Sequence, residues 1–409
     1  MERRRVKKTG GHTVGIYIHI PFCLKKCPYC SFNSLESPQD DYGPYIDALL
    51  EELARRSEEF PFPSEREIES LYIGGGTPSL LPAGEIDRLI EGVRWVMPLQ
   101  DDAEVTIEAN PGTVDIKSLK GLRGTGINRL SLGIQSVNDR SLKTLGRIHS
   151  SMDGMAAFQS TRDAGFENIG IDLIFGLPEQ TLEDWRGDVE KVIMMRPEHI
   201  SLYSLMMEEG TPFYERYGAG GLSTPFEEEV VVMYRWALER FEEVGYHQYE
   251  VSNLALPGFE SRHNTRYWRH GDYIGLGAGA HSYTVSPGWG RRWWNIPDPG
   301  DYIESITLNG QAVDGEEELT RDDALLEAIF LGLRRREGIE VGQFVDRFGV
   351  SPAECLPLER LKVRGLVSCD GGRLRLTEEG VILSDEVSAT VQGVSSPETA
   401  LCRQAGYAI

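Results

Sequence analysis

The stretch that decides the fold is Cys23-Leu24-Lys25-Lys26-Cys27-Pro28-Tyr29-Cys30, in which three cysteines share one short segment. Their spacing is C-x3-C-x2-C. Cysteine thiolates hold iron–sulfur clusters, and a cluster that only transfers electrons uses four of them. Three thiolates on one loop would leave the fourth iron of a [4Fe–4S] cluster open to another ligand. The spacing therefore predicts a cluster that does chemistry on a molecule it binds.

Composition narrows the class of protein. The 409 residues include 64 acidic and 42 basic side chains, which gives a net charge of −22. Such a surface repels phosphate backbones, so we expect no nucleic-acid partner. No apolar run reaches the roughly 18 residues of a transmembrane helix. Cys355, Cys369 and Cys402 are scattered, which favours a reducing cytoplasm over a disulfide framework. We expect a cytoplasmic protein, with peripheral membrane contact where its partners lie in a membrane.

Short apolar runs alternate with longer amphipathic ones over the first two-thirds of the chain. We expect strands at 15–20, 68–73, 103–109, 128–133, 168–175 and 199–204. We expect helices at about 41–59, 84–97, 115–123, 139–164, 181–195 and 224–245. Repeated strand–helix order is typical of an α/β fold with a parallel sheet and helices outside. Six such units predict a partial, open β/α barrel over residues 14–245, with functional residues at the C-terminal ends of its strands.

The remaining segments differ in composition. Residues 1–13 form a basic start with no apolar run behind it, so we expect a disordered tail rather than a signal peptide. Residues 246–315 are rich in glycine and aromatic side chains, and we interpret them as an accessory region. Residues 316–390 predict a small α+β domain like a winged helix, followed by a tail over 391–409. This domain lacks a basic recognition helix, so we expect it to be structural or to contact a partner.

Glycine-rich and polar segments follow the predicted strands. Gly74-Gly75-Gly76-Thr77-Pro78 closes the second strand, where a backbone without side chains lets a ligand approach closely. S-adenosylmethionine offers an amino and a carboxylate group to an open iron. Its charged groups and ribose hydroxyls need carboxylates, a cation and an amide close by. Candidates for these roles at the strand ends are Glu108, Gln135, Arg147 and Asp172.

The run from Tyr17 to Cys30, with the motifs at 74–78, 133–136 and 172–181, resembles the radical-SAM superfamily. It resembles more closely the branch of oxygen-independent coproporphyrinogen III oxidases, over about residues 14–390. The resemblance implies a [4Fe–4S] cluster held by Cys23, Cys27 and Cys30. It also implies S-adenosylmethionine contacts at Tyr17, Tyr29, Gly75, Gly76, Thr77, Glu108, Gln135, Arg147 and Asp172.

Two features depart from the oxidase pattern. Phe32 stands where the oxidase has a further cysteine, and only 22 residues precede Cys23. Both resemble the heme-chaperone members of the branch, in which an H-N-x-x-Y-W signature is tied to heme binding. Here the signature is His263-Asn264-Thr265-Arg266-Tyr267-Trp268. The resemblance implies that His263, Tyr267 and Trp268 contact heme, the histidine as an axial ligand and the aromatic rings by stacking.

Alternatives remain for these histidines and for the function. His263 could instead be a loop histidine hydrogen-bonded to backbone, and His281 is a second, weaker heme candidate. The leading hypothesis is a heme chaperone that delivers heme to recipients such as membrane-bound respiratory enzymes, in a family whose members can form homodimers. The alternative is a coproporphyrinogen III oxidase, in which a 5′-deoxyadenosyl radical abstracts hydrogen from a propionate side chain. Whether the protein is an enzyme stays open between the two.

Overall fold

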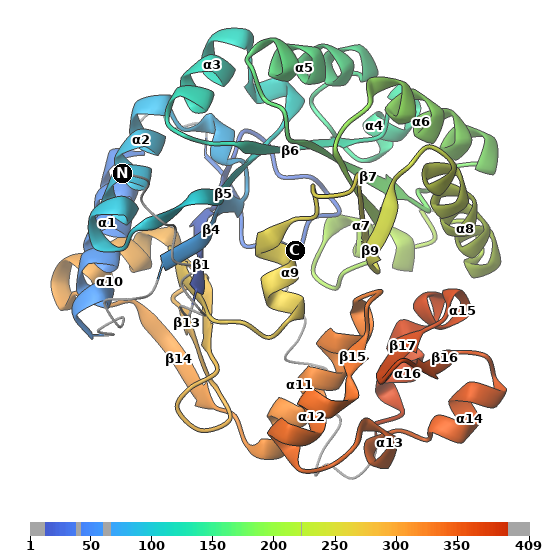
Figure 1. The fold of residues 1–409 in the computed structure, drawn as a ribbon. Helices are drawn as coiled ribbons and strands as arrows, with labels where there is room; N and C mark the ends of the chain where they lie inside the picture. The colour runs from blue at the N-terminus through green and yellow to red at the C-terminus, as the bar shows by residue number, and fades with distance from the viewer. Residues whose placement is uncertain (1–12, 38–41, 60–66, 222, 392–409) are drawn as a thin grey trace, which may run out of the picture.

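The computed structural model describes residues 13–37, 42–59, 67–221 and 223–391. Its centre is six parallel strands in the spatial order β1-β4-β5-β6-β7-β8. They are β1 (Thr13–Ile20), β4 (Glu67–Gly75), β5 (Leu99–Ala109), β6 (Arg129–Gln135), β7 (Ile169–Phe175) and β8 (His199–Ser204). Figure 1 shows these strands as an arc that does not close. The expected α/β fold with a partial parallel barrel is confirmed.

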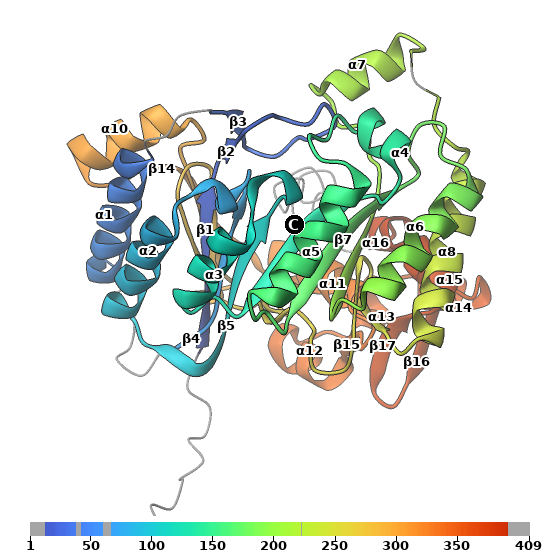
Figure 2. The ribbon, with the colours of Figure 1, turned by 90° about the horizontal axis from the view of Figure 1, so that it is seen from above.

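Helices cover the convex outer side of this arc (Figures 1 and 2). They are α1 (Gly43–Glu59), α2 (Ala83–Val96), α3 (Ile116–Gly124), α4 (Asp139–Thr144), α5 (Ser151–Asp163), α6 (Leu182–Met195) and α8 (Glu227–Glu243). One helix was expected over 139–164, and that expectation is wrong. Gly146 adopts a left-handed φ of +71°, and Ser150 then caps a new helix. The break places Arg147 in a loop at the strand ends.

Residues 246–315 extend the same sheet at both edges. At one edge β10 (Asn253–Ala255) and β9 (His247–Glu250) follow β8. At the other edge β11 (Tyr273–Leu276) pairs in parallel with β1. It is followed outward by β12 (His281–Thr284), β13 (Arg291–Asn295) and β14 (Val313–Glu318). The domain boundaries at 245 and 315 stay predictions.

The helix α9 (Arg262–Trp268) lies on the inner side of the strand arc (Figure 1). Its first amide groups, those of Arg262 and His263, each donate to the buried carboxylate of Glu104 on β5 at 3.1 Å. A carboxylate is favourable at a helix N-terminus, where backbone N–H groups lack partners. Arg266 ties the helix to the N-terminal ends of β1 and β4 through the Thr13 carbonyl (3.0 Å) and Glu69 (2.8 Å).

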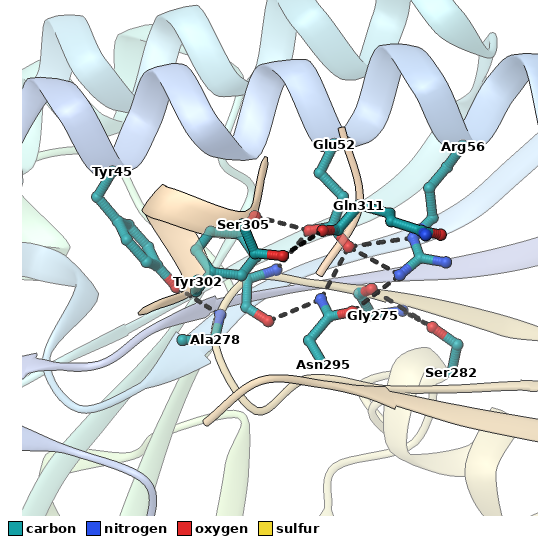
Figure 3. A network of polar contacts seen from close by, with 11 residues as sticks. Tyr45, Glu52, Arg56, Gly275, Ala278, Ser282, Asn295, Tyr302, Ser305 and Gln311 are labelled. Atoms are coloured by element: carbon teal, nitrogen blue, oxygen red, sulfur yellow. Dashed lines mark hydrogen bonds and ion pairs between the residues drawn. The ribbon is translucent and has the colours of Figure 1, made fainter. Parts of the chain in front are cut away.

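A buried polar network joins α1 to the strands beyond β11 (Figure 3). Its centre is the carboxylate of Glu52, which pairs with Arg56 at 2.9 Å. The same carboxylate accepts from Asn295 Nδ2 at 2.8 Å, Tyr302 O–H at 2.7 Å and the Gly277 amide at 2.9 Å. These bonds fix the loop after β11 and the helix α10 (Pro299–Asn309) against α1.

The C-terminal elements lie across the open side of the arc (Figure 1). Their three-stranded sheet has the order β15-β17-β16, with β15 (Ile339–Glu340), β16 (Val367–Asp370) and β17 (Arg373–Leu376). The helices are α11 (Arg321–Arg334), α12 (Val341–Phe348), α13 (Pro352–Cys355), α14 (Leu358–Val363), α15 (Glu378–Ile382) and α16 (Ser384–Ala389). This is the expected small α+β domain. The predicted tails lie outside the described residues, apart from Thr13 and Val391. Among the described helices, none combines the length and the apolar character that crossing a membrane requires.

Short elements complete the chain. The strands β2 (Phe22–Cys23) and β3 (Leu35–Glu36) pair with each other on either side of the cysteine loop. Two 3-10 turns, η1 (Pro78–Leu80) and η2 (Pro111–Thr113), follow β4 and β5, and α7 (Pro212–Gly218) follows β8. All of these lie at the C-terminal ends of the parallel strands, where the sequence places the functional motifs.

Candidate functional site

The three cysteines of the loop lie beyond the C-terminal end of β1. Cys23 ends β2, and Cys27 and Cys30 are linked by a tight turn in which the Cys30 amide donates to the Cys27 carbonyl at 3.1 Å. All three are free and partly exposed. Two of the sulfur atoms accept hydrogen bonds. Thr77 Oγ1 lies 3.6 Å from Cys23 Sγ, and Arg147 Nη1 lies 3.4 Å from Cys27 Sγ.

This donor set fits an iron–sulfur cluster. Thiolates are its usual ligands, and hydrogen bonds to sulfur tune such clusters. Burial raises the pKa of Cys23 and of Cys30 above the ordinary value, while the Thr77 hydroxyl and the Arg147 charge act in the opposite direction on Cys23. Among the described residues, no three His, Cys, Asp or Glu side chains meet at a point that a single metal ion could occupy.

The glycine turn after β4 runs directly beside Cys23. Gly75 has a φ of +118°, a conformation that side chains strongly disfavour. A Cβ atom on Gly76 would lie 2.7 Å from the Phe22 carbonyl oxygen and 3.0 Å from Cys23 Sγ. Both positions therefore require glycine, and the backbone between them is bare where a ligand of the cluster would approach.

Two partly buried carboxylates stand near this turn, at β5 and β7. Glu108 accepts from the Tyr72 O–H at 2.7 Å and from the Gly75 amide at 3.0 Å. Burial raises its pKa to about 7, with the charge of Asp172 adding to the effect. Asp172 accepts from Ser131 Oγ at 3.2 Å, and burial raises its pKa as well. Carboxylates desolvated in this way would be stabilised by a cationic or hydroxyl-bearing ligand.

The raised pKa of Glu108 predicts a pH effect on stability. The folded state holds this proton more tightly than the unfolded state, so the stability it contributes is full below pH 4.5 and is lost as pH rises through about 7. We expect the unfolding free energy of the wild type to fall, relative to Glu108→Gln, by up to about 3 kcal/mol over this range. Urea unfolding of both proteins at about pH 5 and pH 8 measures the difference. A difference that stays constant, or that grows with pH, would contradict the assignment.

Arg147 and Gln135 lie at the same C-terminal ends of the parallel strands, a region called the mouth of the barrel below. Arg147 Nη2 donates to the Gly133 carbonyl at 2.8 Å and also bonds Asn110 Oδ1, so the guanidinium bridges the ends of β5 and β6 to Cys27. Gln135 holds a left-handed φ of 68°, and its buried Oε1 has no hydrogen-bond partner among the described residues. A strained residue with an unpartnered buried acceptor suits a ligand-binding position.

Aromatic rings lead from this mouth to α9. Tyr17 on β1 stacks on Tyr72 of β4 with ring centroids 6.2 Å apart, and Tyr72 stacks on His263 at 5.1 Å. The Tyr17 hydroxyl is also bonded to His19 Nδ1 at 2.9 Å. Tyr29 stands apart from this row, edge-on to Phe213 at 6.1 Å. The ring stack therefore connects the signature helix to Tyr72, whose hydroxyl donates to Glu108 beside the glycine turn.

The imidazole of His263 is enclosed on α9. It is 1% exposed, with Nδ1 2.9 Å from Ser70 Oγ and Nε2 2.8 Å from the Tyr267 hydroxyl. Burial lowers its pKa to about 3, so the ring is neutral. The alternative of a loop histidine bonded to backbone is wrong, because the residue is helical and both partners are side chains. Both ring nitrogens are engaged, so iron could reach one only by displacing its partner.

The other heme candidates lie in different surroundings. Trp268 is 7% exposed and sits under the Arg334 guanidinium at 4.7 Å, at the end of α9. His281 is on β12, where its ring stacks on Trp294 at 5.8 Å, and burial lowers its pKa to about 4. Neighbouring Trp293 is fully buried in the core.

Asn110, Ser70 and Tyr72 belong to the site but were not predicted from the sequence. Asn110 joins Thr77 (2.8 Å) to Arg147, and its position directly after β5 was a usable signal. Ser70 and Tyr72 are two positions apart on β4, so their side chains lie on the same face of the strand, toward His263. They stood in an apolar run that indicated only a buried strand.

Comparison with known proteins agrees with this geometry. The Radical SAM superfamily matches residues 17–192, and the HemN C-terminal domain matches residues 319–383. A relative named heme chaperone HemW from Bacillus subtilis is 36% identical over 380 residues, covering 92% of this chain and 98% of the relative. The protein of that name from Escherichia coli is 40% identical over 278 residues, covering 67% of this chain and 71% of the relative.

The fold has a counterpart among solved structures. Coproporphyrinogen III oxidase (HemN) from Escherichia coli superimposes with a TM-score of 0.79 at 24% identity, over 93% of this chain and 90% of the other. That likeness concerns the fold. The identity over nearly the full length of the Bacillus subtilis relative goes further: this chain belongs to the HemW family of the radical SAM superfamily.

Proposed function

We propose that this protein is a heme chaperone, which binds heme and passes it to recipient proteins. The observation that carries the proposal is the end-to-end match with relatives named for that function. The geometry supports it, because the signature helix α9 lies inside the strand arc and is joined through Tyr72 to the mouth with the three cysteines. The finer roles given below are part of the same proposal.

In this proposal Cys23, Cys27 and Cys30 would hold a [4Fe–4S] cluster, and the bare turn at Gly75 and Gly76, beside Cys23, would admit its ligand. The cluster, when bound, would supply a one-electron donor with a position for the amino and carboxylate groups of S-adenosylmethionine. Thr77 and Arg147 would stabilise negative charge on the sulfur atoms. The ligand's own groups would be met by Glu108, Asp172 and Gln135, with Tyr17 and Tyr29 beside it.

Heme would be held at α9. The neutral imidazole of His263 is in the protonation state that iron requires. Its Nε2 is bonded to Tyr267, so binding exchanges that hydrogen bond for iron, and the released tyrosine and Trp268 can contact the porphyrin face. Loading therefore requires a local opening of α9, and so does release of the heme to a recipient.

Two substitutions test this exchange in opposite directions. His263→Ala removes the ligand and should weaken heme binding by tenfold or more. Tyr267→Phe keeps the ring but frees Nε2, and should tighten binding or speed association. The measurement is a Soret titration with heme, and His247→Ala, at an exposed histidine on β9, is the matched control. The proposal fails if the wild type shows no Soret shift, and ligation by His263 fails if neither substitution changes the titration.

The oxidase alternative has a separate test. The reconstituted protein is incubated without oxygen with coproporphyrinogen III, S-adenosylmethionine and a reductant. We expect no protoporphyrinogen to form, and its formation would favour the oxidase.

Heme delivery is a separate prediction, because we propose recipients among membrane-bound respiratory enzymes. When heme-loaded protein is mixed with cytoplasmic membranes that lack heme, heme should leave the protein for the membrane fraction. We also propose that the protein can form a homodimer, which the molar mass of the heme-loaded protein in analytical sedimentation would test.

A further inference from the structure

A cavity of about 780 Å³ opens at the end of the barrel opposite the cysteine loop. It lies between the outer turns of α9, the N-terminal end of β4 and the segment after α11, and its lining includes Glu69, Trp268, Arg269 and Arg336. Its volume is within the range of small-molecule sites, about 300–1,000 Å³. None of the residues assigned above to the cluster or to S-adenosylmethionine lines it.

The lining is positive in a strongly acidic protein. The whole chain carries −22. Five arginines line the cavity against three glutamates, and one of the five, Arg262, is paired with Asp102, so the lining keeps a net positive charge. The arginines are Arg262, Arg266, Arg269, Arg335 and Arg336, facing Glu69, Glu260 and Glu337. Arginine forks match carboxylates in a bidentate geometry, and Arg269 and Arg335 share the single carboxylate of Glu337, so the lining suits a ligand that brings carboxylates of its own.

Buried donors in this lining lack partners. Arg336 Nη1 and Trp268 Nε1 are both enclosed, and neither has a hydrogen-bond acceptor among the described residues. Burial lowers the pKa of Arg335, its ion pair with Glu337 acts in the opposite direction, and the charge of Arg269 lowers it further. An enclosed donor without an acceptor is costly, so an anionic ligand that reached the Arg336 guanidinium would offset this cost.

The cavity also adjoins the signature histidine. Arg266, in the lining, is one helical turn beyond His263 on α9, and both side chains meet over Gly15: a Cβ atom there would lie 2.9 Å from Arg266 Cδ and 3.4 Å from His263 Cε1. The Trp268 ring, with Arg334 above it, adds an aromatic wall. The short helix α9 thus carries the arginines, the aromatic ring of Trp268 and the signature histidine together.

We propose that this cavity receives the propionate edge of heme, with the arginines of α9 and of the 335–336 segment as the carboxylate ligands. The inference rests on the proposed heme-binding function and deepens it. It adds a carboxylate-recognition site to the signature, and it makes the two carboxylates a determinant of which tetrapyrroles bind.

The test compares heme with its dimethyl ester, in which both carboxylates are blocked, by Soret titration of the full-length protein in one detergent-containing buffer. We expect the wild type to prefer heme by about ten- to hundredfold, the factor that one or two charge-assisted hydrogen bonds provide. The double variant Arg335→Gln/Arg336→Gln should bind heme only as well as the ester, with ester binding unchanged. Arg364→Gln, in the same domain but paired with Glu386 outside the cavity, should behave as wild type.

The outcomes separate the two proposals. If heme binds but the wild type does not prefer it over the ester, or the double variant loses heme and ester equally, the cavity assignment is overturned and heme binding stands. If neither compound binds, the heme-chaperone function fails and the cavity assignment with it. Should the double variant not fold, Arg269→Gln replaces it, because that side chain is 59% exposed. We expect Arg269→Gln to lose part of the preference for heme over its dimethyl ester. An unchanged preference would overturn the cavity assignment.

Discussion

Cys23→Ser, Cys27→Ser and Cys30→Ser are each expected to abolish the proposed iron–sulfur cluster. Each substitution removes one of the three proposed ligands, and the loop offers no replacement, since the position of a further cysteine is occupied by Phe32. After anaerobic reconstitution with iron and sulfide, each variant should lack the visible absorption and the bound iron of the wild type.

The control for this experiment is Cys369→Ser. Cys369 is an exposed free cysteine on β16, remote from the loop in the chain, and its replacement should leave iron content unchanged. Variants at Cys23, Cys27 and Cys30 that all retain iron and colour would remove the basis for placing a cluster here.

Glu52→Ala is expected to lower the unfolding free energy by about 3–5 kcal/mol, the usual result of removing one partner of a buried ion pair. The substitution leaves the buried Arg56 guanidinium without its carboxylate (Figure 3). It also deprives Asn295, Tyr302 and the Gly277 amide of their common acceptor.

The matched control is the adjacent residue. Glu51 pairs with Arg55 on the solvent side of the same helix, and both side chains are 48% exposed. Such a pair contributes little, so Glu51→Ala should change stability by less than about 1 kcal/mol. Urea unfolding of the two variants gives the comparison. Equal midpoints would show that the Glu52 network does not hold α10 and the extended strands to α1.

The six central strands could be predicted because both faces of each are covered. A parallel strand under helices is a nearly continuous apolar run, as in β1 and β7, and it stands out between amphipathic segments. The cysteine spacing and the glycine turn were visible for a related reason: each is a short local pattern whose chemistry does not depend on distant residues.

The edges of the sheet could not be predicted in the same way. The strand β14 has the sequence Val-Asp-Gly-Glu-Glu-Glu and is mostly exposed, so nothing apolar marks it. It is a strand because it pairs with β13, where Arg291 and Arg292 face Glu316 and Glu317 as ion pairs. That pairing is a tertiary contact, which no local pattern reports.

The surroundings of His263 show the same limit within the site. The signature marked the residue, but its partner Ser70 is 193 positions away on β4. Whether the imidazole is open to iron or closed depends on that contact and on Tyr267. The arginine cavity likewise unites α9 with a segment some 70 residues later, and neither part indicates a site alone.

We propose that a cluster and a heme occupy adjoining places in this one protein. The decisive experiment is a heme titration of the anaerobically reconstituted wild type, followed in the Soret region and by iron and sulfide analysis of the recovered complex. We expect a saturable Soret shift with the cluster's iron and sulfide retained. A shift that never saturates, or that appears only as the cluster is lost, would show that the two do not occupy the protein together.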